Sequence, residues 1–200
     1  HSVISPDGTT IAFTYKGDIY TVPVAGGRAM QITTNPAYDT APVWSPDSKR
    51  IAFASDRMGS LDVYIVAKDG GEPRRLTTHS GSETPLAFTD AGHVLFSAGI
   101  MPSAEAVVFP SNGQFNQVYR VSVEGGRPTM ISSMPMECIS INKEGAMLYQ
   151  DKKGYEDYWR KHHVSPIARD IWMYTPGKEP QYRQLTTFGG EDREPVWADR

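Results

Sequence analysis

A unit of about 40 residues that recurs along the chain is the feature that most constrains its fold. The turn sequence Ser-Pro-Asp followed by a small residue occurs at 5–8 and 45–48, and related turns occur at 89–92 and 142–145. Proline favours the second position of a tight turn, and aspartate favours the third through local hydrogen bonds. The turns start 40, 44 and 53 residues apart. An internal repeat of this length is typical of solenoids, propellers and related arrays.

The second repeat shows how each unit is built. Its opening strand ends at Trp44, and the turn leads to a second strand, Ile51-Ala52-Phe53. A third strand begins with Asp62-Val63-Tyr64, and a Gly-Gly turn leads to a fourth strand that ends in Leu76-Thr77-Thr78. The second strand alternates large apolar residues with a small one, so both of its faces can be buried against neighbouring sheets. Four short antiparallel strands per unit form the pattern of a β-propeller blade.

We therefore predict an all-β fold, with a single β-propeller segment over residues 1–200. Its four complete four-stranded antiparallel blades are expected at about 1–34, 41–78, 84–133 and 137–187. Residues 194–200 would form the first strand of a fifth blade, so we expect a segment of a six- or seven-bladed propeller. A closed four-bladed ring and a β-sandwich with coincidental turns are the alternatives.

Composition narrows the classes of function. The chain has 39% hydrophobic residues and a net charge of −3, and its Lys and Arg residues are scattered. We therefore expect neither nucleic acid nor a membrane as a partner. The single Cys138 excludes an internal disulfide and a zinc site built on cysteines, and we expect it to be a small buried residue. No phosphate loop, dinucleotide fingerprint or EF-hand loop occurs, so no cofactor is expected.

The up-and-down order of the strands places the loops on two faces. The turns between strands one and two and between strands three and four share one face, and these turns are short. The loops between strands two and three, called the B–C loops below, share the opposite face with the connections between units. From the strand-two aromatic to the start of strand three, the separation grows from 5 to 9, 21 and 21 residues. Long loops in a compact domain are often functional, so the insertions at 97–116 and 150–169 predict a functional face.

Two sets of residues are candidates for that function. The B–C insertions hold aromatic, basic and histidine side chains of the kinds found at interfaces, and the alternative is that these side chains pack on the propeller rim. The candidate interface residues are Phe109, Tyr158, Trp159, Arg160, His162 and His163. A catalytic or zinc-binding role for the two histidines has no supporting motif or spacing. We assign no catalytic, cofactor or metal residue.

The second set consists of acids that recur near the start of the opening strands, at the expected mouth of the central channel. They are Asp39, Glu83, Glu137 and Asp192. One interpretation is an acidic ring that attracts cations or a positively charged peptide terminus. The other is structural, with each carboxylate capping backbone N–H groups of the connection between units.

The repeat resembles the propeller repeat of TolB and of tricorn-type proteases, and more loosely that of the prolyl oligopeptidase families. Residues 155–165, running on to Arg169-Asp170-Ile171-Trp172, look like the fourth-blade region of the N-terminal propeller of tricorn-like proteases. This resemblance implies a non-catalytic module of a prokaryotic serine peptidase, exported or cytoplasmic, that guides substrate access or product passage. The implied partners are a peptide or protein substrate, other domains of the parent chain and, as an open option, further copies of it. A free-standing TolB-like interaction module is the alternative.

Overall fold

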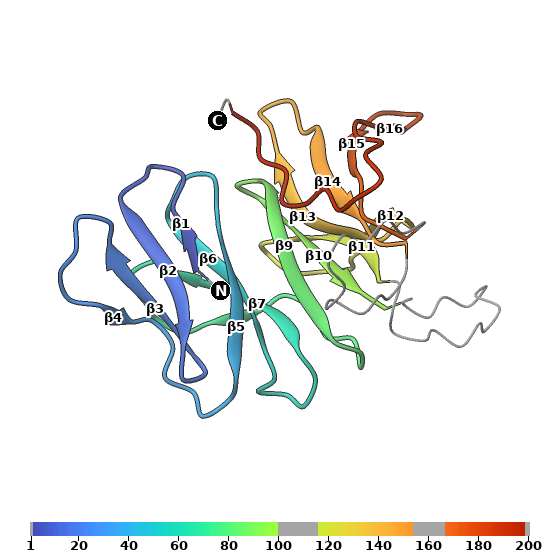
Figure 1. The fold of residues 1–200 in the computed structure, drawn as a ribbon. Helices are drawn as coiled ribbons and strands as arrows, with labels where there is room; N and C mark the ends of the chain where they lie inside the picture. Colours follow the sequence, from blue (N-terminus) through green and yellow to red (C-terminus); the bar gives the residue numbers. More distant parts are fainter. Residues whose placement is uncertain (1, 100–115, 154–166, 199–200) are drawn as a thin grey trace. The chain divides into compact units, whose positions relative to one another are not determined.

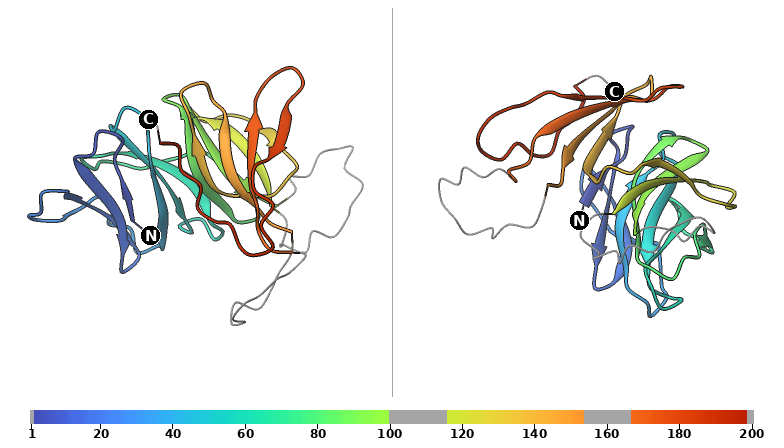
Figure 2. Two further views of the ribbon diagram at one scale, coloured as in Figure 1. Left: turned by 45° about the horizontal axis from the view of Figure 1, so that its top comes forward. Right: turned by 90° about the vertical axis from the view of Figure 1, so that its right-hand side faces the viewer.

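The computed structural model describes residues 2–99, 116–153 and 167–198, and it confirms the all-β prediction. The described strands form four antiparallel sheets of four strands each, and every sheet takes its strands in chain order (Figure 1). Figure 2 gives two further views of these strands. The described residues contain no helix long and apolar enough to cross a membrane.

The sixteen strands fall into four successive groups, one for each predicted blade. They are β1 (Ser2–Ile4), β2 (Thr10–Tyr15), β3 (Asp18–Pro23) and β4 (Met30–Gln31); β5 (Asp39–Trp44), β6 (Arg50–Ser55), β7 (Asp62–Ala67) and β8 (Arg74–Arg75); β9 (Glu83–Asp90), β10 (His93–Ala98), β11 (Gln117–Ser122) and β12 (Thr129–Ser132); β13 (Met136–Ile141), β14 (Met147–Asp151), β15 (Ile171–Thr175) and β16 (Gln181–Gln184).

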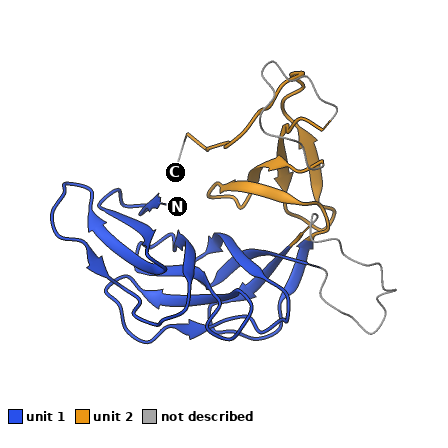
Figure 3. Ribbon diagram, turned by 60° about the horizontal axis from the view of Figure 1, so that its bottom comes forward, with its two compact units in different colours: residues 1–101, 118–131 blue, residues 102–117, 132–200 orange. Residues whose placement is uncertain are grey.

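Contacts between residues divide the chain into two compact units, which are described separately (Figure 3). Unit 1 comprises residues 1–101 and 118–131, and unit 2 comprises residues 102–117 and 132–200. Unit 1 contains the first two sheets and most of the third, and unit 2 contains the fourth.

The core of unit 1 lies between successive sheets, and β6 contributes to both of its layers. Ile51 and Phe53 pack in a cluster with residues of the first sheet, whereas Ala52 packs in a cluster with residues of the third. All three side chains are fully buried. Because side chains alternate between the two faces of a strand, the Ile-Ala-Phe pattern fills one interface with large groups and the other with a small one. The prediction that both faces of this strand are buried is confirmed.

The Ser-Pro-Asp turn has the geometry that its sequence predicts. The amide of Ser48 donates to the carbonyl of Ser45 at 2.9 Å, which places Pro46 and Asp47 at the two central turn positions. The Ser45 hydroxyl donates to Asp47 at 2.6 Å and accepts from the amide of Arg50 at 2.9 Å. The turn at residues 5–8 repeats these contacts. The turn sequence therefore fixes the hairpin between the first two strands of a blade.

A residue with positive φ recurs in three of the opening segments, those that end at Trp44, Ile141 and Trp197. In each segment it lies three positions before the end. Ala41 and Cys138 both have φ 51°, and Glu194 has φ 54°. In β5 and β13 this residue lies at a shift in strand register, which marks a β-bulge. The bulge breaks the alternation of sides along the strand, and Cys138 is exposed rather than buried as we expected.

Residues 194–198 occupy the place of an opening strand, although they form no strand among the described residues. The amide of Asp192 donates to the carbonyl of Arg169 at 2.9 Å, as the amide of Asp39 donates to Gly17 at 2.7 Å. The positive φ of Glu194 repeats that of Ala41. A strand needs a partner, and no described strand forms a ladder with this segment.

Candidate functional site

The predicted interface residues cannot be placed. Phe109 and the group from Tyr158 to His163 lie outside the described residues. Their role stays a prediction. The site that can be built from the described residues is therefore the set of repeated acids.

Backbone contacts place three of these acids at equivalent points of the repeat. The amides of Asp39, Glu83 and Asp192 donate to the carbonyls of Gly17, Leu61 and Arg169, at 2.7, 2.7 and 2.9 Å. Each of these carbonyls belongs to the residue directly before a repeated aspartate, at positions 18, 62 and 170. Each acid therefore lies where one unit passes into the next, as the repeat predicts. The repeated interaction is made by the backbone, which any residue except proline could provide.

Glu137 is offset by one residue from the other acids. In the second sheet Asp39 pairs with Ser55. In the fourth sheet Met136 occupies the equivalent position and pairs with Asp151, whereas Glu137 pairs with the next residue, Gln150. A shift of one residue turns a side chain to the other face of a strand. Met136 is accordingly buried and Glu137 is about one-third exposed.

The carboxylate of Asp39 is fully buried and paired with a single arginine. The guanidinium of Arg57 lies 3.1 Å from both carboxylate oxygens, and its Nε donates to the Ser55 hydroxyl at 2.9 Å. The same guanidinium lies over the rings of Tyr64 at 4.5 Å and Phe53 at 5.6 Å. A buried acid held in this way presents no free negative charge, which supports a structural role.

Glu83, the first residue of β9 in the third sheet, is also fully buried, and it lies near Asp62 and Arg75 of the second sheet. Neither of its carboxylate oxygens has a well-aligned hydrogen bond to a described donor. Burial raises the pKa of Glu83 to about 7, and the nearby charge of Asp62 acts in the same direction. The Thr77 hydroxyl, the Arg75 guanidinium and the His79 amide favour the anion but do not offset the burial.

Asp62 completes this cluster, and sequence reasoning did not select it. Its buried carboxylate forms an ion pair with Arg75 at 2.9 Å. Burial raises the pKa of Asp62, although the hydrogen bond and charge of Arg75 oppose the rise. The available signal was the aspartate that recurs at the start of the third strand, at positions 18 and 62, or directly before it, at position 170.

This third-strand aspartate belongs to a repeated device that joins strands three and four. In the first sheet, Asp18 accepts from the side-chain amide of Gln31 at 3.0 Å, and in the fourth sheet, Asp170 accepts from that of Gln184 at 2.9 Å. In the second sheet, Arg75 takes the place of the glutamine and forms an ion pair with Asp62 at 2.9 Å. The backbone N–H of the residue after each aspartate donates to a threonine hydroxyl near the end of the unit. The three bonds run from Ile19 to Thr33, from Val63 to Thr77 and from Ile171 to Thr186. The fourth strands are short, and these side-chain hydrogen bonds and the ion pair of Arg75 link their ends to the third strand of the blade.

In unit 2, Glu137 belongs to a network of opposite charges. It accepts from Gln150 at 3.2 Å and pairs with Lys152 and Arg169, each at 3.3 Å. Burial alone would raise the pKa of Glu137, but these three partners lower it overall. Arg169 also reaches Glu191 at 3.5 Å. Of the repeated acids, Asp192 is left with one buried oxygen that has no hydrogen bond to a described donor.

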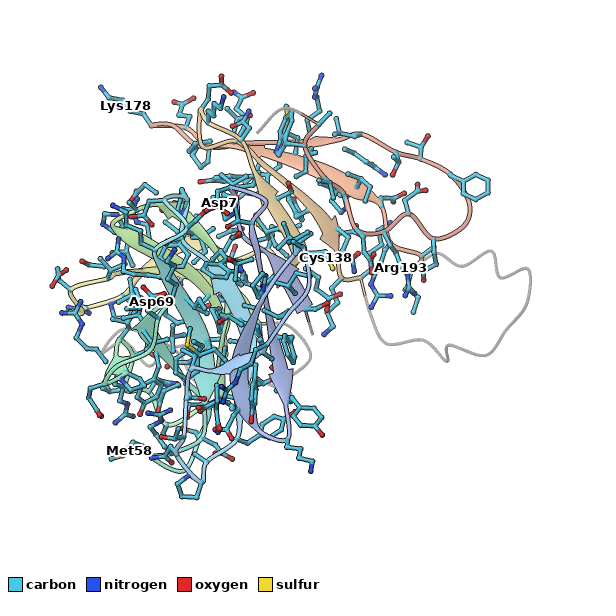
Figure 4. The ribbon with its side chains drawn as sticks, turned by 90° about the vertical axis from the view of Figure 1, so that its left-hand side faces the viewer. Asp7, Met58, Asp69, Cys138, Lys178 and Arg193 are labelled. Carbon is cyan, nitrogen blue, oxygen red and sulfur yellow. The ribbon has the colours of Figure 1, made fainter. Side chains whose placement is uncertain are left out.

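Other features of the described residues offer no further chemistry. The described chain holds no group of three or more His, Cys, Asp or Glu side chains arranged to bind a metal. A hollow of about 630 Å³ lies beside β4, where Tyr20, Thr21 and Met30 face Lys68 and Asp69 of the next turn. Asp69 is labelled in Figure 4, together with the exposed Cys138 of unit 2. The repeated acids do not line this hollow.

Proteins related in sequence point to one family. Tricorn protease homolog 1 of Streptomyces coelicolor is 25% identical over 194 residues, which are 96% of this chain and 17% of that protein. The Tol-Pal system protein TolB of Bordetella pertussis is 44% identical over 55 residues, which are 27% of this chain and 13% of that protein. The matched part of the chain thus spans about a sixth of the length of the first relative and about an eighth of the second.

Solved structures show the same fold. The crystal structure of the tricorn protease matches with a TM-score of 0.72 and 18% identity, over 95% of this chain and 18% of that one. The structure of a putative TolB from Agrobacterium tumefaciens matches with a TM-score of 0.62 and 22% identity, over 96% of this chain and 68% of that one. The model of the tricorn protease N-terminal beta propeller domain matches residues 3–200. Because that match covers nearly the whole chain, the protein belongs to the family of tricorn protease N-terminal β-propeller domains.

Proposed function

We propose that this chain is a non-catalytic propeller module of a tricorn-like serine peptidase. It guides peptide substrates toward the catalytic part or products away from it, and it contacts other domains through the face that carries the B–C loops. The observation that carries this proposal is the family match over residues 3–200. The Streptomyces relative, of which this chain covers 17%, supports a larger parent protein.

The described side chains are consistent with a scaffold rather than a catalytic centre. Asp39 is neutralised by Arg57, Glu137 by Lys152 and Arg169, and Glu83 is buried. These ion pairs lie within single blades: Asp39 and Arg57 in the second, and Glu137, Lys152 and Arg169 in the fourth. This supports the assignment of the chemistry to another part of the parent protein.

The proposal is tested by comparing the 200-residue chain with the full-length gene product on a panel of fluorogenic peptides. The expected result is hydrolysis by the full-length protein and none by the chain alone. Deleting these 200 residues from the parent protein should reduce kcat/KM for long peptides more than for dipeptide substrates. A full-length gene product without a peptidase core would refute the proposal.

The alternative is a free-standing TolB-like module that binds a protein partner. The 44% identity to the TolB of Bordetella pertussis over 55 residues favours it. This function predicts a stoichiometric partner in a pull-down. Replacing Trp159 and Arg160 by alanine should weaken that complex by more than about 1 kcal/mol if they are hot spots. Replacing the exposed Lys178 by alanine is the control, and equal losses in both variants would count against the interface.

A further inference from the structure

Glu83 is the least compensated of the fully buried acids in unit 1. It is the first residue of β9, its side chain has no exposed surface, and neither oxygen has a well-aligned hydrogen bond to a described donor. The other two fully buried aspartates, Asp39 and Asp62, each have an arginine at about 3 Å. A carboxylate buried without such a partner is costly when ionised.

The groups that face Glu83 cannot neutralise it completely. Asp62 comes from β7, Arg75 from β8, and Thr77 and His79 from the connection that leads to β9. Arg75 supplies the guanidinium of this cluster, and it is already paired with Asp62. His79 is the other side chain of the cluster that can carry a positive charge. With His79 neutral, two ionised carboxylates would therefore share one guanidinium and leave one negative charge in excess.

The neighbouring charges do not supply the missing cation. The guanidinium of Arg57 lies over the ring of Tyr64 and is bound by both oxygens of Asp39. With His79 neutral, the buried charges of this part of unit 1 are therefore balanced when one proton is held by the pair of Asp62 and Glu83.

We propose that Asp62 and Glu83 share one proton, and that this proton controls a latch. With the proton bound, the connection 78–82 stays closed over the start of β9; when the proton is lost, the connection opens and admits water to Glu83. This inference goes beyond the proposed function and does not depend on it.

The connection is the element suited to this movement. Residues 78–82 form no strand, and each is exposed or partly exposed, whereas Asp62 and Arg75 belong to strands. The Ser60 hydroxyl donates to the carbonyl of His79 at 3.3 Å and ties the connection to the rest of unit 1. The bond from the Gly81 amide to Nδ1 of His79, at 3.1 Å, lies within the connection itself. Burial, which raises the pKa of Glu83 to about 7, places the loss of the proton near neutral pH.

Two measurements on the 200-residue chain test the latch. The first is titration of the Glu83 carboxyl by carbon-13 NMR, assigned by the resonance that disappears in Glu83→Gln. The second is hydrogen exchange of the amides of 78–82, corrected for the intrinsic effect of pH. Because one proton is linked to opening, the opening equilibrium should rise by up to about tenfold per pH unit between about pH 5 and 7 and then level off.

Variants identify the group responsible. Glu83→Gln should stay closed at every pH in this range, and Glu72→Gln, at an exposed position, should behave as the wild type. Asp62→Asn removes the like charge and frees Arg75 for Glu83, so the midpoint of the Glu83 titration should fall. His79→Gln should keep the pH profile.

Several outcomes would overturn the proposal. One is a Glu83 carboxyl that titrates in the ordinary acidic range. Another is a pH profile of exchange that persists in Glu83→Gln or vanishes in His79→Gln, since the titrating group would then be a different one. An unchanged midpoint in Asp62→Asn would exclude a shared proton even if Glu83→Gln failed to fold.

Discussion

The indole Nε1 of Trp197 donates to the backbone carbonyl of Ser140 at 3.0 Å. Trp44 makes the same bond to the carbonyl of Val3 at 3.2 Å. Val3 and Ser140 are equivalent, because each lies two residues before the first residue of its turn. The tryptophan that ends an opening strand therefore binds the opening strand of the preceding blade. This repeated bond and the positive φ of Glu194 give 194–198 two features of an opening strand, and the start of a fifth blade there stays a prediction.

Trp44→Phe should lower the free energy of unfolding of unit 1 by about 2 kcal/mol. The substitution removes the N–H donor, leaves the Val3 carbonyl without it and opens a small cavity at a buried site. Urea unfolding followed by circular dichroism measures the loss. Trp197→Phe is the matched variant, and its loss should be smaller because Trp197 is only partly buried. Equal losses would show that the bond matters more than the burial.

Asp39→Asn should destabilise the protein by about 3 kcal/mol. The guanidinium of Arg57 has a side-chain exposure of 11%, and without Asp39 it would be a buried cation with no counter-charge. Arg57→Met combined with Asp39→Asn removes both charges, so the double variant should recover part of the loss. The exposed Asp69→Asn is the control and should change stability by less than about 0.5 kcal/mol. An additive double variant would contradict a direct coupling of the two side chains.

The repeat was predictable because its signals are local. The turn requires Ser45, Pro46 and Asp47, so it can be recognised from these residue types in the sequence. A strand with both faces buried, such as 51–53, can be recognised from its apolar residues. The four sheets were predicted by counting how often these two patterns recur. Spacing alone also placed Asp39, Glu83 and Asp192 at equivalent points, as their backbone bonds confirm.

The details of the acidic site were not predictable from the sequence. We grouped Glu137 with Asp39, although Glu137 lies four residues before the end of its strand and Asp39 lies five, and the register of β13 gives the position of Asp39 to Met136. The bulge at Cys138 likewise turned an expected buried residue outward. The pairing of Asp39 with Arg57 joins residues 18 apart through a loop, and no periodic pattern marks such a contact.

Glu137 should make the stability of unit 2 depend on pH. The pKa of Glu137 is lower in the folded protein than its ordinary value of 4.5. Its contribution is therefore present above about pH 4.5 and is lost as the pH falls through the lower, folded value. Thermal unfolding of the wild type and Glu137→Gln should differ most near neutral pH and converge toward about pH 3. Glu144→Gln, in an exposed turn, should run parallel to the wild type, and a difference that grows in acid would contradict the assignment.

Ser45→Ala should destabilise the turn of the second blade by about 1–3 kcal/mol. The hydroxyl of Ser45 is buried and accepts from the amide of Arg50, so its loss leaves that N–H without its partner. The bond from Ser45 is also the largest influence that lowers the pKa of Asp47, and that pKa should move back toward its ordinary value. Urea unfolding and carbon-13 NMR of the Asp47 carboxyl measure the two effects.

Two further serines show whether the effect belongs to the repeated turn. Ser5→Ala should lose a similar amount of stability, because Ser5 makes the same bonds to Asp7 and Thr10 in the first blade. The exposed Ser80→Ala should be neutral. If Ser45→Ala unfolds at the wild-type urea concentration while the pKa of Asp47 still rises, the hydroxyl acts on its neighbour without stabilising the hairpin. The packing of Ile51 and Phe53 would then be what holds the two strands together.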